Sequence, residues 1–281
     1  MNFHQKPITF VHQVNLKVQS LTHALDFYQH VIGFKILEKN DTSAHLTADG
    51  KTVLLSIYQP EKVVPKSSRT TGLYHFALLL PNRSDLASIV DHFAKIDLQL
   101  GAADHLVSEA LYLSDPDGNG IEIYVDRDSS NWKWNNGEVA MTTDPLNVAD
   151  LLSKEKGSWK GLPSGTKMGH IHLHVSDLKK AEEFYVKGLG FNVVNRYGNQ
   201  ALFISDGKYH HYIGLNTWNG VGAPAPSANS VGLESYGLLV ANEEKRNNII
   251  AQIKQIGAPV YEKNGKVITV DPAGNRISLD I

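Results

Sequence analysis

The sequence predicts an α+β protein built from four βαβββ modules, which are grouped in two similar halves. Two repeats indicate the halves. Residues 18–34 align without a gap on residues 175–191, sharing a Phe-Tyr pair and a final Gly-Phe in register, and the turn Asp115-Pro-Asp-Gly-Asn119 recurs as Asp271-Pro-Ala-Gly-Asn275. A third observation divides each half again, because a strand-like run, an amphipathic helix and three further strand-like runs occur twice within it.

Each module has its own helical pattern. The first module starts with a strand at residues 13–18, and its helix presents an apolar face of Leu21, Ala24, Leu25, Tyr28 and Val31 before Gly33 ends it. The second starts at residues 73–80, has a helix with Leu86, Ile89, Val90, Phe93 and Ile96, and ends in a strand at residues 121–125. The third spans residues 170–216, and the fourth spans residues 236–280 with Ile249, Ile250, Ile253 and Ile256 on its helix.

Two stretches fall outside the repeat. Residues 127–166 contain three tryptophans and two prolines, Trp132, Trp134, Pro145, Trp159 and Pro163, and we interpret them as a connector. We therefore expect an N-terminal domain over residues 8–126 and a C-terminal domain over residues 167–281. Residues 217–232 are rich in Gly, Pro, Ala, Ser and Asn, which is typical of a loop that covers a site or of a linker.

Composition limits the classes of partner. The chain of 281 residues has a net charge of −2 and no basic stripe, so we expect neither nucleic acid nor membrane as a partner. Because the start lacks a basic-then-apolar leader, we expect a cytoplasmic protein. Small neutral or modestly polar ligands are the expected partners, and assembly with further copies of the chain stays open. Cysteine is absent, so any metal must bind through histidine, carboxylate or carbonyl groups.

Pseudo-equivalent positions in the four modules differ in chemistry. On the first strand they are, with an uncertainty of one residue for the last, Gln13, His75, His170 and Ser235. On the last strand, counted four residues beyond the turn glycines, they are Leu54, Glu122, His211 and Ser278. The two middle modules thus hold His75, Glu122, His170 and His211, which we predict to be metal ligands.

The ligand types narrow the choice of metal. Imidazole and carboxylate without thiolate suit Fe(II), Mn(II), Zn(II), Ni(II) or Co(II), and two histidines with one carboxylate are the usual non-haem Fe(II) set. A lone histidine is more often structural, but joint occurrence at corresponding positions favours ligands. His172 and His174 share a strand face with His170, so the first ligand could slip by two residues. A one-residue bulge would exchange His210 and His211.

Four long runs carry a resemblance to a known family. They are residues 72–77 (Gly-Leu-Tyr-His-Phe-Ala), 104–124, 169–178 and 209–218 (Tyr-His-His-Tyr-Ile-Gly-Leu-Asn-Thr-Trp). The chain resembles the two-domain catechol 2,3-dioxygenases of bacilli, within the vicinal oxygen chelate (glyoxalase/bleomycin-resistance/extradiol-dioxygenase) superfamily. The resemblance implies Fe(II)-dependent opening of a catechol ring next to its two hydroxyls, with O2 as co-substrate, in the catabolism of aromatic compounds.

The pattern also departs from that family, whose ligands come from the two modules of the C-terminal half. Here the last module offers Ser235 and Ser278, so that pair cannot assemble the set. Pairing the first and second modules would give Gln13, His75 and Glu122, which is similar to glyoxalase I. Pairing the second and third gives His75, Glu122, His170 and His211, and we favour this pairing.

Ligand counting leaves alternatives open. Four protein ligands on an octahedral metal leave two positions, whereas a bidentate catechol plus O2 needs three. Either His211 or His170 therefore does not bind the metal, or the protein is not an extradiol dioxygenase. We predict a dioxygenase that uses His172 or His210 as base and Tyr212 as hydrogen-bond donor. The alternatives are a glyoxalase-like metal-dependent isomerase or lyase, and a non-catalytic protein that binds an aromatic ligand.

Overall fold

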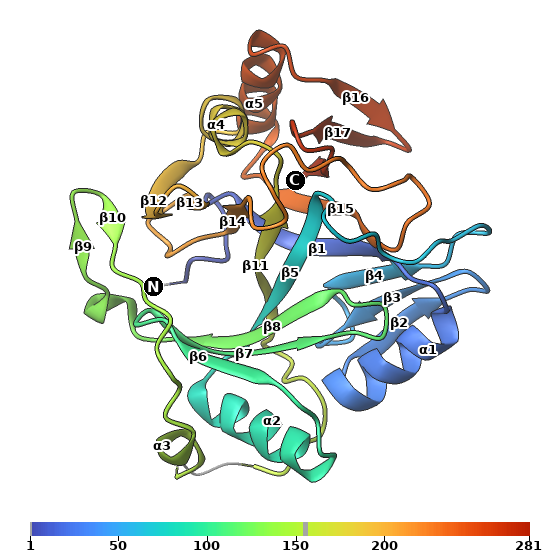
Figure 1. Ribbon diagram of the computed structural model, residues 1–281, viewed down its shortest axis with the longest axis vertical. Coiled ribbons are helices and arrows are strands. Elements are labelled where there is room, and N and C mark those ends of the chain that lie inside the picture. Colours follow the sequence, from blue (N-terminus) through green and yellow to red (C-terminus); the bar gives the residue numbers. More distant parts are fainter. Residues whose placement is uncertain (1, 154–156) are drawn as a thin grey trace.

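The strands of the protein form two eight-stranded sheets and one short ribbon. The structure is a computed structural model that describes residues 2–153 and 157–281. The first sheet has the order β16-β17-β18-β15-β1-β4-β3-β2, and the second has the order β12-β13-β14-β11-β5-β8-β7-β6 (Figure 1). The first sheet thus joins the first and fourth modules, and the second joins the second and third. The pairing favoured from the sequence is confirmed.

The bounds of the strands follow the repeat. The first sheet consists of β1 (Phe10–Lys17), β2 (Lys35–Lys39), β3 (Ser43–Thr47), β4 (Leu55–Tyr58), β15 (Gly232–Leu239), β16 (Val260–Lys263), β17 (Lys266–Val270) and β18 (Arg276–Asp280). The second consists of β5 (Gly72–Leu79), β6 (Gly101–Asp104), β7 (Ser108–Ser114), β8 (Gly120–Asp126), β11 (Lys167–His174), β12 (Asn192–Tyr197), β13 (Ala201–Ser205) and β14 (Ile213–Asn216). The ribbon pairs β9 (Trp134–Asn135) with β10 (Glu138–Val139).

The helices begin at polar caps and differ between odd and even modules. They are α1 (Leu21–Asp26), α2 (Arg83–Lys95), α3 (Val148–Leu152), α4 (Leu178–Glu182) and α5 (Glu243–Gln255), with a 3₁₀ turn η2 (Ser129–Asn131). Side chains of Ser20, Asn82, Asp177 and Asn242 accept a backbone hydrogen bond at four of the helix starts. In the odd modules α1 and α4 continue as π-helical segments, η1 (Phe27–Ile32) and η3 (Glu183–Gly188).

Gly33 ends the first helical segment, as the sequence predicts. Its φ of 89° is left-handed, a conformation that glycine adopts at low cost. A Cβ at this position would also lie 2.6 Å from the Cα of Gly161, so the connector approaches the backbone here too closely for any side chain. Glycine is therefore required both for the turn and for the contact.

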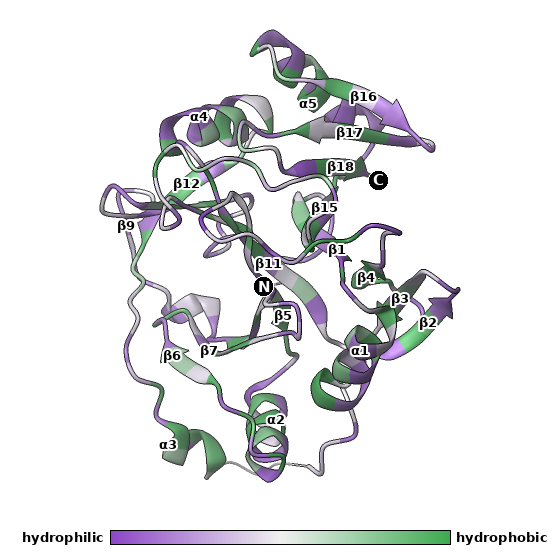
Figure 2. Ribbon diagram, turned by 45° about the vertical axis from the view of Figure 1, so that its right-hand side comes forward, coloured by the Kyte–Doolittle hydropathy of each residue, from purple (hydrophilic) through white to green (hydrophobic). Residues whose placement is uncertain are grey.

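The helices pack on the sheets through their apolar sides. Helix α2 buries Leu86, Ile89 and Phe93 as predicted, and it lies below β6, β7 and β8 in Figure 1. Ile96 departs from the prediction, because the helix ends at Lys95 and the Ile96 side chain is 45% exposed. Figure 2 shows hydrophobic and hydrophilic stretches within α1 and α2 and a hydrophilic end of β16. No helix in the described part of the chain is long and apolar enough to cross a membrane.

The two repeated motifs contact one another. The hydroxyl of Tyr28, from the first Phe-Tyr pair, donates to Asp115 Oδ2 of the first Asp-Pro turn at 2.8 Å. The hydroxyl of Tyr185, from the second pair, donates to Asp271 Oδ2 of the second turn at 2.9 Å. Each contact joins an odd module to the following even module, and hence one sheet to the other.

Candidate metal centre

The register of the second sheet places three potential ligands together. Cross-strand pairing forms one row that runs through Gly101, Tyr112, Glu122, Ala77 and His170. Directly paired residues project from the same face of a sheet, and neighbouring strands lie about 4.8 Å apart. His75 lies two residues before Ala77 on β5, so its side chain projects from this face too. The centre of the sheet therefore presents His75, Glu122 and His170 to one side.

The three side chains converge on one point. The Nε2 atoms of His75 and His170 both lie 3.0 Å from Oε2 of Glu122. The potential ligand atoms all lie within 4.8 Å of one another, and all three residues are buried. Burial raises the pKa of Glu122, but the adjacent His170 and His75 outweigh this effect and hold that pKa well below its usual range. Burial lowers the pKa of His170, which favours the neutral imidazole that binds metals.

These residues fit a divalent transition metal. Two imidazoles and a carboxylate without thiolate form a donor set typical of non-haem Fe(II) and chemically related ions. Two buried nitrogens, Nε2 of His75 and Nδ1 of His170, have no hydrogen-bond partner in the described part of the chain. Nε2 of His75 lies 3.0 Å from the Glu122 carboxylate without forming an aligned hydrogen bond, and because an unpaired buried polar atom costs free energy, this arrangement favours a site that accepts a cation.

His211 lies beside this group but outside it. Its ring centroid is 4.2 Å from that of His170. Because His75 and His170 are equivalent, Ala77 on β5 corresponds to His172 on β11. The parallel pairing of β5 with β8 sets Glu122 opposite Ala77, and the matching pairing of β11 with β14 sets Gly214 opposite His172. Gly214, and not His211, thus occupies the position that corresponds to Glu122. The loop at residues 206–212 is longer than the turn at residues 115–119, so counting from the turn glycine gives the wrong register.

A cavity reaches two of the three potential ligands, His75 and Glu122. Its volume is about 380 Å³, and its lining includes His75, Glu122, His172 and His211. The remaining lining comes from β5, β6, β7 and the turn between them, β12, β13, the connector and Trp218, namely Tyr74, Gly101, Ala102, Ala103, His105, Val107, Ser108, Tyr112, Met141, Thr142, Thr143, Asn195, Tyr197, Phe203 and Trp218. The size falls within the range of about 300–1,000 Å³ that is usual for small-molecule sites.

His172 faces this cavity in a defined tautomer. The side-chain oxygen of Asn216 accepts from the backbone N–H of Trp218 at 3.0 Å, so its amide nitrogen faces His172 Nε2, also at 3.0 Å. The amide donates and Nε2 accepts, which leaves the proton of neutral His172 on Nδ1. Burial holds the pKa of His172 well below its usual range, so the neutral form prevails at pH 7.

The other two predicted catalytic residues lie outside the cavity lining. His210 is fully buried, with Nε2 2.9 Å from Asp126 Oδ1 and Nδ1 2.8 Å from His211 Nδ1. The hydroxyl of Tyr212 donates to the backbone oxygen of Phe3 at 2.6 Å. Both residues therefore support the wall around His211 and contribute no atom to the cavity surface.

Tyr112 and His105 are cavity residues that sequence reasoning missed. Tyr112 is paired directly with Glu122, and burial together with that carboxylate raises its pKa well above the usual range. Nδ1 of His105 donates to the carbonyl oxygen of Thr142, so Nε2 faces the Tyr112 hydroxyl at 2.6 Å. Strand alternation across residues 108–114 was a sequence signal that could have placed Tyr112 on the same face as the ligands. The contact between Tyr112 and His105 has no such signal, because it depends on how the connector packs.

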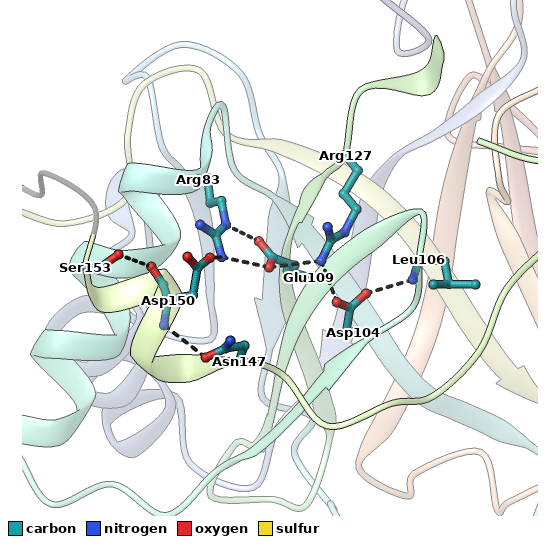
Figure 3. A network of polar contacts seen from close by, with 8 residues as sticks. All are labelled: Arg83, Asp104, Leu106, Glu109, Arg127, Asn147, Asp150 and Ser153. Carbon is teal, nitrogen blue, oxygen red and sulfur yellow. Dashed lines mark hydrogen bonds and ion pairs between the residues drawn. The ribbon is translucent and has the colours of Figure 1, made fainter. Parts of the chain in front are cut away.

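A network of ion pairs fixes the hairpin that carries these residues (Figure 3). Glu109 is buried and accepts from Arg83 Nη2 at 3.0 Å and from Arg127 Nη2 at 3.1 Å. Arg127 also pairs with Asp104, and Arg83 pairs with Asp150 of α3. The network thus joins the end of β6 and the start of α2 to the connector, directly before the β6–β7 turn that carries His105.

The first sheet has no such ligand set at the corresponding place. The same register comparison matches Gln13 with His170, Ser235 with His75, and Ser278 with Glu122. Gln13 Nε2 donates to Asn15 Oδ1 at 2.8 Å, and Asn15 Nδ2 donates to Ser235 Oγ at 2.9 Å. Amide and hydroxyl groups that satisfy one another therefore replace the histidines and the carboxylate.

Comparison with known proteins agrees with this architecture. The sequence pattern of the Glyoxalase/Bleomycin resistance protein/Dioxygenase superfamily matches residues 10–123 and again residues 167–279. The chain belongs to this superfamily. The two matched regions cover most of the chain, and each contains one odd and one even module.

Individual relatives give a closer comparison. The chain is 44% identical over 268 residues to the catechol-2,3-dioxygenase of Bacillus subtilis strain 168, and the alignment covers 94% of each protein. It is 26% identical over 117 residues to biphenyl-2,3-diol 1,2-dioxygenase 3 of Rhodococcus globerulus, over 40% of this chain and 60% of that protein. The solved structure of glyoxalase I from Zea mays superposes with a TM-score of 0.59 at 16% identity, over 96% of this chain and 92% of that one. This last likeness concerns the fold.

Proposed function

We propose that this superfamily member is an extradiol-type, ring-cleaving dioxygenase, which opens a catechol-like ring next to its hydroxyls with O2. The observation that carries the proposal is the buried set of His75, Glu122 and His170, of which His75 and Glu122 line a cavity that fits a small aromatic molecule. The 44% identity to a catechol-2,3-dioxygenase over nearly the whole chain supports the same reaction class.

The three residues would hold Fe(II), and His211 would not bind it. A face of two histidines and one carboxylate is the protein share of iron sites that keep positions open for substrates. When bound there, the metal would lower the pKa of the diol hydroxyls and hold the diol close to its co-substrate. A three-ligand set also removes the conflict that four protein ligands create for a bidentate substrate and O2.

The residues of the chain itself supply orientation and proton transfer. The Tyr112 hydroxyl donates to His105 Nε2 at 2.6 Å, because Nδ1 of His105 donates to the connector, and this hydrogen-bonded pair at the cavity wall would serve as the path for a proton to or from the substrate. His172 presents its Nδ1 proton as a donor, because Asn216 occupies Nε2. Tyr74 and Trp218 lie against His172, with centroid separations of 5.1 Å and 5.3 Å, and limit the access of water from that side.

The reaction is tested with protein reconstituted anaerobically with Fe(II) and then mixed with catechol in air. We expect oxygen uptake and a yellow ring-opened product. Parallel samples with Mn(II), Co(II), Ni(II) and Zn(II) identify the metal that supports turnover. Absence of oxygen uptake by fully iron-loaded protein would falsify the proposal, and turnover without oxygen would indicate an isomerase or lyase instead.

The ligand set is tested separately by metal content. The variants Glu122→Gln and His170→Gln should each lose most of the bound metal after gel filtration, whereas His211→Gln should retain it. The exposed Glu262→Ala on β16 is the control for a lost carboxylate. Equal metal loss in the His211 and His170 variants would show four protein ligands and contradict the three-ligand assignment.

A further inference from the structure

We infer that Gly101, Ala103 and Met141 form a specificity subsite, which accepts an uncharged apolar substituent on the substrate ring and disfavours a carboxylate. The inference rests on the proposed function and adds the substrate class. The three residues lie on β6 and on the connector, and all line the cavity above the metal centre. None of them belongs to the potential metal ligands or to the Tyr112–His105 pair.

The side chains of β6 are smaller than those of the corresponding strands in the other three modules. The strand begins Gly-Ala-Ala, whereas the corresponding edge strands β2, β12 and β16 contain neither glycine nor alanine. Gly101 ends the row that contains Tyr112 and Glu122, and Ala103 is the next residue on the same face. Two neighbouring positions on this edge of the ligand face therefore carry no side chain larger than a methyl group.

The surface next to the metal row is apolar. Ala103 pairs with Ala110, and Ala110 pairs with Tyr124. Ala110, Tyr124 and Ala77 form a small apolar cluster that is separate from the main core and is flanked by Leu79 and Tyr112. This cluster lies behind the cavity wall, and the wall itself offers Ala102, Ala103 and Met141 to a substituent that extends from the ring toward β6. Each CH₂ buried there strengthens binding about fourfold.

The cavity lining lacks a cationic Lys or Arg side chain among its described residues, which disfavours an anionic substituent on the substrate. Glu122 is the one carboxylate among the described lining residues, and these include no lysine or arginine. The nearest arginines of the hairpin, Arg83 and Arg127, are engaged by Glu109. A substrate carboxylate would therefore lose water without gaining a cation, which weakens binding by at least about tenfold.

The cavity is also larger than an unsubstituted ring requires. A dry cavity of about 150 Å³ is enough to hold benzene. The volume of about 380 Å³ over the metal centre leaves room for further atoms beyond the catechol ring. The free space and the small residues of β6 are parts of the same cavity.

Anaerobic calorimetric titration of the iron-loaded protein tests the inference with matched pairs of probes. The pairs are 3-methylcatechol with 2,3-dihydroxybenzoate and 4-methylcatechol with 3,4-dihydroxybenzoate, and the series is extended with 3- and 4-ethylcatechol. We expect the alkylcatechol of at least one pair to bind ten or more times as tightly as its carboxylate partner. Equal or tighter binding of the carboxylate in both pairs overturns the inference.

Variants locate the effect on the chain. Gly101→Val and Ala103→Leu should each lower the ratio of ethylcatechol to catechol affinity by at least about fivefold, because both fill the same space. Gly101 has no positive φ, and a Cβ there meets Tyr112 at an ordinary 3.5 Å, so the backbone tolerates this change. Ala251→Leu, on the exposed side of α5, is the control and should leave the ratio unchanged.

A variant with added charge gives the opposite readout. Met141→Arg places a cation in the lining and should raise the affinity for a dihydroxybenzoate about tenfold relative to the wild type. Unchanged ratios in both small-to-large variants, or no gain with Met141→Arg, refute the subsite. If the wild type neither binds any catechol anaerobically nor cleaves one in air, the proposed function itself fails, and the subsite fails with it.

Discussion

Replacing Tyr28 by phenylalanine removes one hydroxyl group from the contact between the two repeated motifs. The hydroxyl lies at the end of a fully buried side chain and donates to Asp115 Oδ2 at 2.8 Å. Burial and the adjacent carboxylate raise the pKa of Tyr28 well above its usual range, so the hydroxyl stays protonated as the donor. The substitution keeps the ring and its packing, and therefore tests the hydrogen bond alone.

The expected loss follows from the partners that remain. Asp115 also accepts from the backbone N–H of Asp117 at 2.9 Å, and from the backbone and side-chain amides of Asn119 at 2.8 Å each. The carboxylate thus keeps three of four donors but loses one charged hydrogen bond, which is worth about 1.5–3 kcal/mol. Because water cannot reach the site, we expect the free energy of unfolding to fall by about 2 kcal/mol and the Tm to fall by on the order of 4 °C.

Urea denaturation of the metal-free protein, followed by circular dichroism, measures this change. Tyr58→Phe is the matched control, because the Tyr58 side chain is 45% exposed, and it should change the free energy of unfolding by less than about 0.5 kcal/mol. Tyr185→Phe should cost more than Tyr28→Phe, since the Tyr185 hydroxyl contacts both Asp271 and the hydroxyl of Tyr236. A Tyr28→Phe variant as stable as the control would refute this account of the contact between the sheets.

Three further outcomes are expected. Burial lowers the pKa of His4 to about 4, so the unfolded state binds a proton more tightly than the folded state between pH 6.5 and 4. The free energy of unfolding should therefore fall by about 3 kcal/mol as the pH drops through this window, and urea titrations at pH 7 and 4.5 should find this loss largely absent from the His4→Gln variant. Metal analysis should find a second bound ion in the first sheet after the combined changes Gln13→His, Ser235→His and Ser278→Glu, and an unchanged stoichiometry would contradict the register equivalence. Glu109→Gln leaves two arginines without their buried carboxylate and should lower the free energy of unfolding by roughly 1–3 kcal/mol, whereas a neutral result in denaturant would show that the network is dispensable.

Much of the architecture could be predicted because the repeats are encoded locally. The spacing of apolar residues and the capping residues set the four helices, and first-strand comparison identified His75 and His170 as equivalent. The structure places Gly214, and not His211, at the position that corresponds to Glu122, because the loop before β14 is longer than the turn before β8. Loop length is set by packing against other segments, and a count along one chain does not reveal it.

Contacts between distant segments were beyond the reach of the sequence. The Phe-Tyr pairs and the Asp-Pro turns were recognised as separate repeats, but only the fold brings Tyr28 onto Asp115. His105 faces Tyr112 because a connector carbonyl fixes its other nitrogen. The sheet register places His170 in the row of Ala77 and Glu122 and sets His172 opposite His75, a difference that strand alternation alone does not show.

The crossed sheets divide the potential ligands between the two halves of the chain. His75 and Glu122 precede the connector and His170 follows it, so neither half of the chain holds the complete metal centre. Two identical halves that crossed in this way would form a symmetric dimer with two equal centres. In this chain the two sheets are not equal, because hydrogen-bonded amides and hydroxyls around Gln13 and Ser235 occupy the place in the first sheet that the ligand set occupies in the second. The protein thus has the form of two joined, crossed halves, in which the second sheet carries the ligand set and the first sheet carries none of it.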